Sequence, residues 1–205
     1  MNYDDFNTGD LLLFNNNKPT GIMGLFTDLI KYSTHSNYSH VAMVLKDPKF
    51  LHPSLKGLFV WESSWEGKPD PQDNKIKLGV QITPLQEILN DYKDNIVMLR
   101  KIKCDKPVFD DQTLADIHKV VYDKPYDIVP KDWLSAFFRK DDNPQKVSRF
   151  WCSALVGYIY TTCGILEPST DWSILRPNDF SVEGELLSLT GIATLDDCET
   201  RVELK

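Results

Sequence analysis

Four short apolar runs separated by polar, turn-forming segments lie in the first half of the chain and limit the folds open to it. They occupy residues 11–14, 40–45, 59–63 and 95–100. Short apolar runs bounded by turn residues are typical of buried strands, whereas helices need longer stretches. Residues 22–32 interrupt the series, because their apolar side chains recur at helical spacing and predict a short helix. The first half is therefore expected to be mainly strand.

Helical patterns follow in the second half. Residues 110–122 place apolar side chains on one stripe and acidic residues in the first turn, where they favour the helix dipole. Residues 150–163 repeat an apolar i, i+4 pattern, with Ser148 as the expected N-cap and Gly164 as the expected residue just past the end. Because the predicted strands come first along the chain and the predicted helices follow, the sequence indicates an α+β protein.

The length and net charge of the chain argue against several classes of protein. A chain of 205 residues fits one domain, residues 1–205, and neither a repeat nor a linker divides it. The net charge of −7 and pI near 5.1 argue against a nucleic-acid-binding protein, which would carry a basic patch. The first ten residues are polar and acidic, unlike a signal peptide, and no apolar run is long enough to span a bilayer. We expect a cytoplasmic or otherwise intracellular protein.

The four cysteines predict free thiols. Cys152 and Cys163 fall on one predicted helix, where eleven residues rise about 16 Å, well beyond the Cα separation of about 7 Å that a disulfide tolerates. Cys104 and Cys198 complete the set without forming a compact secreted framework. The sequence also has no CxxC or HExxH pair. We therefore expect no metal and no cofactor.

Cys152 is the strongest chemical candidate. It lies at the start of the predicted helix, where unpaired backbone N–H groups and the positive end of the dipole stabilise a thiolate. The same N–H groups are suited to hold the oxyanion of an acyl-transfer intermediate. The alternative is an ordinary buried cysteine, since free cysteine is among the most buried residue types. Cys163 lies on the core-facing stripe and is assigned that structural role.

A thiolate nucleophile needs a base, and His40 is the candidate. It opens an apolar strand directly after a polar loop, so rigid structure would hold it at an open edge. The alternative is a partly exposed histidine that caps the strand. His52 and His118 are expected to face solvent, as is His35, which is also the one further histidine with a possible place in a substrate site.

Glu62 is the candidate to orient the imidazole. It lies inside the apolar strand at 59–63, and its carboxylate can accept from the imidazole if two adjacent strands carry His40 and Glu62 on the same face. The alternative is a solvated glutamate on an exposed strand face. No one of these three residues decides the assignment alone.

Five short motifs in a fixed order resemble a known family. They are Thr-Gly-Asp-Leu-Leu-Leu-Phe at 8–14, Ser-His-Val-Ala-Met-Val at 39–44, Trp-Glu-Ser at 61–63, Lys-Pro-Tyr-Asp at 124–127 and Trp-Cys-Ser-Ala-Leu-Val at 151–156. This order is similar to that of the circularly permuted NlpC-type papain-like cysteine hydrolases, and within them to the YiiX-like group. The resemblance covers about residues 8–165 and leaves 166–205 as a C-terminal extension. It implies a permuted papain-like fold in which an antiparallel sheet packs against a C-terminal helix that bears the cysteine.

The resemblance implies roles for named residues. Cys152 would be the nucleophile, His40 its base and Glu62 the partner of the base. Many relatives have glutamate two residues after the cysteine, and Ala154 departs from that pattern. The expected substrate contacts are Tyr38, Tyr126 and Trp151.

The expected activity is cleavage of an amide or ester bond through an acyl-enzyme on Cys152. Related enzymes act on peptides, amides or acyl lipids, so the partner would be a peptide or an acyl-bearing small molecule or lipid. The aromatic segment at 133–140, which ends in two basic residues, would suit peripheral contact with a membrane, or alternatively forms a short buried helix. A second hypothesis is a catalytically silent module that binds a lipid or peptide in the same cleft. A redox-sensing thiol would need a nearby resolving cysteine, and Cys163 is wrongly placed for that.

Overall fold

The computed structural model describes residues 2–15, 37–104, 106–127, 146–184 and 187–203. The helix expected at residues 22–32 and the aromatic segment at 133–140 lie outside these ranges, as does His35. Among the described residues, no helix has the length and apolar character needed to cross a membrane.

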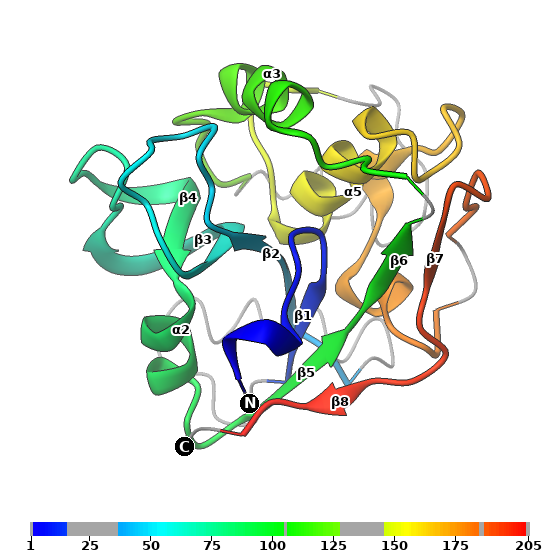
Figure 1. Ribbon diagram of the computed structural model, residues 1–205, viewed down its shortest axis with the longest axis horizontal. Helices are drawn as coiled ribbons and strands as arrows, with labels where there is room; N and C mark the ends of the chain where they lie inside the picture. Colours follow the sequence, from blue (N-terminus) through cyan, green and yellow to red (C-terminus); the bar gives the residue numbers. More distant parts are fainter. Residues whose placement is uncertain (1, 16–36, 105, 128–145, 185–186, 204–205) are drawn as a thin grey trace.

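A six-stranded sheet with the order β4-β3-β2-β1-β5-β8 forms the centre of the molecule (Figure 1). All of its neighbouring strands run antiparallel. The strands are β1 Leu11–Asn15, β2 His40–Lys46, β3 Leu58–Pro69, β4 Ile76–Pro84, β5 Ile96–Arg100 and β8 Thr200–Arg201. A separate pair joins β6 Ile102–Cys104 to β7 Ala193–Leu195.

Helices cover both faces of this sheet. The helices are α2 Leu85–Asp91, α3 Asp111–Val121 and α5 Cys152–Thr162, with short 3-10 turns η1 Tyr3–Asp5, η2 Trp172–Ile174 and η3 Pro177–Phe180. Strand alternation sends Val41 and Met43 toward α3 and α5, and Ala42 and Val44 toward α2. The α+β class and the antiparallel sheet against the cysteine-bearing helix are thereby confirmed.

Local sequence patterns predicted the ends of most of these helices and strands to within a few residues. The predicted strands at 11–14, 40–45 and 95–100 match β1, β2 and β5, and Asp110 caps the helix predicted at 110–122 through its side chain. Strand β3 runs on to Pro69, beyond the predicted end at residue 63. Strand β4 was missed, although its apolar residues alternate with period two. These residues are Ile76, Leu78, Val80 and Ile82.

The start of α5 differs from the prediction. Its N-cap is Trp151, and Ser148 lies in a turn before it. The reason is a non-local backbone pairing: the Phe150 N–H donates to the carbonyl of Pro125, and the Phe150 carbonyl accepts from the Asp127 N–H. These bonds keep residue 150 extended, so the helix begins at Cys152. At the other end, Gly164 adopts the predicted left-handed conformation with φ of 74°.

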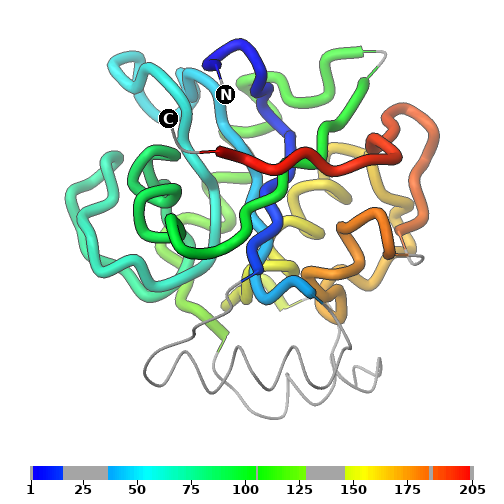
Figure 2. Tube along the Cα trace, turned by 90° about the horizontal axis from the view of Figure 1, so that it is seen from below, coloured from blue at the N-terminus to red at the C-terminus, as the bar shows by residue number. Residues whose placement is uncertain are grey.

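The C-terminal segment joins the sheet. Figure 2 shows it, in red, running across the molecule from the half that holds α5 to the half that holds α2. On the way, β7 pairs with β6 and β8 pairs with β5. The Tyr38 hydroxyl also donates to the carboxylate of Glu199 in this segment, so the extension is tied to the strand that begins at His40.

Candidate active site

His40 and Glu62 form a buried pair on one face of the sheet. The Nε2 atom of His40 lies 2.9 Å from Oε2 of Glu62, whose side chain is 1% exposed. Strands β2 and β3 are neighbours, and both residues lie on the α2 side, as Ala42 and Val60 do. Because an ionised carboxylate only accepts hydrogen bonds, His40 donates from Nε2.

The second oxygen of Glu62 is also bonded. Its Oε1 atom accepts from the Thr83 hydroxyl on β4 at 2.8 Å. The carboxylate is therefore held from two neighbouring strands, which fixes its orientation toward His40. The ring of Phe14, at the end of β1, packs against the imidazole with 5.2 Å between centroids. The imidazole is thus held by a hydrogen bond at one edge and by an aromatic contact on its face.

Cys152 is the first residue of α5, and its thiol lies within hydrogen-bonding range of His40. Backbone N–H groups of Val41 and Ser153 also point to the sulfur. Burial alone would raise the pKa of this thiol, but the imidazolium and these donors outweigh it and lower the pKa below its usual value. The thiolate is therefore the favoured state beside a protonated His40.

The pKa of His40 is shifted in the opposite direction. Burial would lower its pKa, yet the negative charge of Cys152 and the bond to Glu62 outweigh burial and raise the pKa of His40 to about 10. The two shifts describe one ion pair, in which each charge stabilises the other. Such a pair supplies a nucleophile and a proton donor at neutral pH.

Strand β3 supports both halves of this arrangement. Glu62 faces His40, while the next residue, Ser63, faces the other side and donates from its buried hydroxyl to the Phe150 carbonyl at 2.7 Å. That bond fixes the chain two residues before Cys152. After it, the Ser153 hydroxyl donates to the Leu175 carbonyl at 2.7 Å. The position of the thiol is thus set by polar anchors on either side of it in sequence.

The three residues expected to contact substrate lie in different surroundings. Trp151 is half-buried and precedes the thiol as the N-cap of α5. Tyr126 is half-buried, and burial together with the charge of Cys152 raises the pKa of its hydroxyl. Tyr38 is buried and its hydroxyl bonds to Glu199. Trp151 therefore adjoins Cys152 in sequence and the Tyr126 hydroxyl lies within range of its charge, whereas the Tyr38 hydroxyl is engaged with the C-terminal segment.

Of the two other histidines that the structure describes, one is exposed as expected and one is not. His52 is exposed and bonds to the Ser54 hydroxyl. His118 was expected in solvent, and that was wrong: it is half-buried, bonds to Gln72 at 2.7 Å and packs against Trp61. These partners come from the turn between β3 and β4 and from β3 itself, which the helix pattern alone did not indicate.

All four cysteines are free thiols in contrasting surroundings. Cys163 is buried on the core-facing side of α5, as expected, and burial raises its pKa to about 12. Cys198 is exposed, and Cys104 is half-buried. Cys152 therefore combines burial with a lowered pKa, unlike Cys163.

Two further residues beside the site were not singled out from the sequence. Tyr92, after α2, packs against Phe14 with tilted rings and 4.7 Å between centroids, and its pKa is raised by burial and by the charges of Glu66 and Glu62. Glu66 continues the face of β3 that carries Glu62. The alternation of residues 62, 64 and 66 would have placed Glu66 there, had the strand been extended past residue 63. No local signal marks Tyr92.

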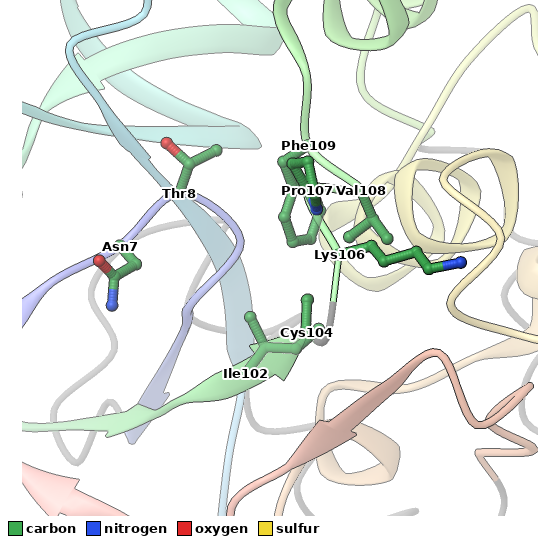
Figure 3. Close-up of a pocket in the computed structure, with 8 residues that line it drawn as sticks. All are labelled: Asn7, Thr8, Ile102, Cys104, Lys106, Pro107, Val108 and Phe109. Atoms are coloured by element: carbon green, nitrogen blue, oxygen red, sulfur yellow. The ribbon is translucent and has the colours of Figure 1, made fainter.

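A separate hollow lies at the other end of β1 from this site. Its volume is about 470 Å³, and Figure 3 shows the side chains that surround it. Strand β1 begins at Leu11, shortly after the lining residues Asn7 and Thr8, and carries Phe14 beside His40. None of the predicted site residues lines it. The lining residues are Asn7, Thr8, Ile102, Cys104, Lys106, Pro107, Val108 and Phe109.

Comparison with protein-family models gives no match, and comparison with curated proteins gives none either. Five chains among solved structures do match, and one of them is the metalloprotein YiiX from Escherichia coli O157:H7. The likeness to YiiX covers 92% of this chain and 95% of that one, with a TM-score of 0.51 and 18% sequence identity. The chain therefore shares the fold of a YiiX-like protein. Within the described ranges, no three His, Cys, Asp or Glu side chains are grouped so that they could hold a metal ion.

Proposed function

We propose that this protein is a papain-like cysteine hydrolase of the permuted, NlpC-like type, which cleaves an amide or ester bond through an acyl-enzyme on Cys152. The observation that carries the proposal is the chain of contacts from Cys152 through His40 to Glu62. Nucleophile, base and orienting carboxylate come from α5, β2 and β3. The cysteine is thus the last of the three in sequence, whereas ordinary members of the class have the cysteine before the histidine.

The first half of the reaction follows from the ion pair. The Cys152 thiolate attacks the carbonyl carbon, and the carbonyl electrons move onto the oxygen to give a tetrahedral oxyanion. The backbone N–H of Ser153, near the sulfur at the helix start, is suited to donate to that oxygen. As the intermediate collapses, the C–N or C–O bond breaks and the leaving group takes the proton of His40. The product is a thioester on Cys152.

Water completes the cycle. The neutral His40 accepts a proton from water, whose oxygen attacks the thioester carbon, and the C–S bond then breaks. The carboxylic acid leaves and the thiolate–imidazolium pair is restored. Glu62 keeps the ring oriented throughout, because both of its oxygens are bonded. In this scheme Glu62 carries no proton itself.

The substrate class is an acyl compound with an apolar portion, either a peptide, another amide or an acyl lipid. Two half-buried aromatic side chains near Cys152, Tyr126 and Trp151, would offer such a substrate an apolar surface. The metalloprotein description of YiiX is not carried over, since the described residues present no matching ligand group. The competing function, a silent binding module in the same cleft, would leave Cys152 unacylated.

Acyl-enzyme trapping distinguishes these two functions. The protein is mixed with p-nitrophenyl esters of increasing chain length, quenched in acid and analysed by intact mass and peptide mapping. We expect one acyl adduct, a thioester on Cys152. The Cys152→Ser variant should form no such thioester, whereas the Cys163→Ser variant should form it as the wild type does. A folded protein that forms no adduct on Cys152, or forms it equally on Cys163, would favour the binding module.

A further inference from the structure

A buried polar ladder continues from the site along β3. Ser64 and Glu66 follow Glu62 at alternate positions of the strand, so they extend the face that carries His40. The Ser64 hydroxyl donates to Oε1 of Glu66 at 2.8 Å and accepts from Nε2 of Gln81 at 2.8 Å. Ser64 and Gln81 are both buried. The Glu66 carboxyl is therefore held in place instead of extending into solvent.

Charged groups from three directions act on this carboxyl. Glu62 and His40 do so from the site, and Asp91 does so from α2. Lys68 lies beyond Glu66 on β3, and the charge of Glu66 contributes to raising the pKa of its amine. That amine is itself paired with Asp91 at 2.5 Å. Tyr92, which adds no charge at neutral pH, also lies within range of Glu66. Glu66 is thus a second carboxyl beside a site that requires only one.

We propose that Glu66 is a positioning residue, which acts through His40: held by Ser64, its carboxylate strengthens the protonated imidazole in the Cys152–His40 pair. The inference rests on the proposed function, because it assigns a role relative to that ion pair. Glu66 itself touches neither the thiol nor a reacting atom in this scheme.

The protonation of Glu66 makes this contribution depend on pH. Burial and the charge of Glu62 raise the pKa of Glu66 to about 7, despite its bond from Ser64. Below that value the Glu66 side chain is neutral, and the negative charges beside the imidazole are those of Cys152 and Glu62. Above it the charge of Glu66 is added to them, which disfavours loss of the His40 proton. The protonated imidazole is then retained further into alkaline solution than Glu62 alone would allow.

The test measures the pKa of His40 directly, by NMR titration of its ring protons in the full chain. Glu66→Gln keeps a group that accepts from Ser64 but removes the charge. We expect it to lower the pKa of His40 by about 0.5 to 1, which is about a three- to tenfold change in the protonation equilibrium. At pH 6, where Glu66 is already neutral, the His40 signals of wild type and variant should coincide. A merely structural role would alter them at both pH values.

Three further variants complete the design. Glu66→Asp retains the charge and should restore the wild-type titration. Glu87→Gln removes a partly exposed acid on α2 and should leave the pKa of His40 unchanged. If Glu66→Gln does not fold, Ser64→Ala frees the Glu66 carboxyl instead and should also lower the pKa of His40.

Alkylation of Cys152 in the wild type separates this inference from the proposed function. Fast, selective alkylation together with an unchanged His40 titration in Glu66→Gln overturns the role of Glu66 and leaves the hydrolase proposal standing. Slow, unselective alkylation overturns the hydrolase proposal itself, whatever Glu66 does.

Discussion

Nε2 of His40 donates to Oε2 of Glu62 across 2.9 Å, and this one bond fixes which nitrogen is left for chemistry. With Nε2 engaged by a carboxylate, the neutral ring carries its proton there, and Nδ1 is the atom free to accept a proton from the thiol. Glu62 in turn accepts from Thr83, so the tautomer is set by residues of two neighbouring strands, β3 and β4.

The first prediction concerns the reactivity of the four thiols. Because the pKa of Cys152 is lowered and that of Cys163 is raised to about 12, iodoacetamide at pH 7 should label Cys152 first and Cys163 last. An ordinary thiol is only a few per cent thiolate at pH 7, so we expect Cys152 to react about tenfold faster than exposed Cys198. Peptide mapping over time gives the rates. Equal rates for Cys152 and Cys198 would contradict the ion pair.

Removal of the base should slow that reaction. In His40→Ala the thiol loses its charged partner but keeps its burial, so its pKa rises and labelling at pH 7 should fall by about tenfold or more. His52→Ala is the matched control, since this exposed histidine bonds only locally to Ser54. The same labelling assay checks both variants. A His40→Ala protein that is folded and labels at the wild-type rate would remove His40 from the mechanism.

Replacement of Glu62 tests whether it orients the ring or transfers protons. In Glu62→Gln the amide oxygen still accepts from His40 and the amide nitrogen still faces Thr83, so the fold and much of the activity should remain. The lost charge lowers the pKa of His40. Because hydrolysis needs the protonated ring, the alkaline limb of the pH–rate profile should move to lower pH. The measurement is the pH profile of ester hydrolysis.

The outcome that contradicts this role is complete loss of activity in a folded Glu62→Gln protein. Glu167→Gln serves as the control, because it removes a carboxylate outside the site and should leave the profile unchanged.

A backbone contact should control the placement of Tyr126. Gly79 has φ of 148°, and an added Cβ would come 2.2 Å from the Lys124 carbonyl oxygen. Gly79→Ala should therefore push the segment of Pro125 and Tyr126 away from β4 and lower the free energy of unfolding by about 2–4 kcal/mol. Gly57→Ala is the control: its φ is also positive, at 106°, but nothing lies near the new atom.

For Gly57→Ala we expect a loss of only about 1 kcal/mol, from backbone strain alone. Urea unfolding measures both values. If the two variants lose the same stability, the close approach at Gly79 does not hold the segment in place.

The sequence indicated the chemistry where the signal was local. His40 at the start of a strand, Glu62 within the next strand and Cys152 at the start of a helix each follow from patterns a few residues long. What brings them together is long-range pairing, which single-residue patterns do not encode. The displaced N-cap illustrates this, because Ser148 has the right side chain but the backbone bonds of Phe150 to the segment at 125–127 keep the chain extended.

Residues that act on the site from a distance were the least predictable. Thr83 is one hydroxyl on a strand that was not foreseen, and its partner Glu62 is identified only by the register of β3 and β4. Tyr92 reaches the site through a tilted ring contact with Phe14, which lies 78 residues earlier in the sequence, and no local pattern marks that contact. The position of Glu66 beside the site could be predicted only with the knowledge that β3 continues past residue 63.

The bond between Tyr38 and Glu199 has a consequence for synthesis of the protein. Tyr38 lies two residues before the base, yet its partner emerges from the ribosome more than a hundred and fifty residues later. Until then, a nascent chain can form β1, β2 and β3 but lacks the contact that fixes the approach to His40. Completion of the segment beside His40 is thus delayed relative to the core, and a chain stalled before residue 199 would lack this bond even where its central strands have formed.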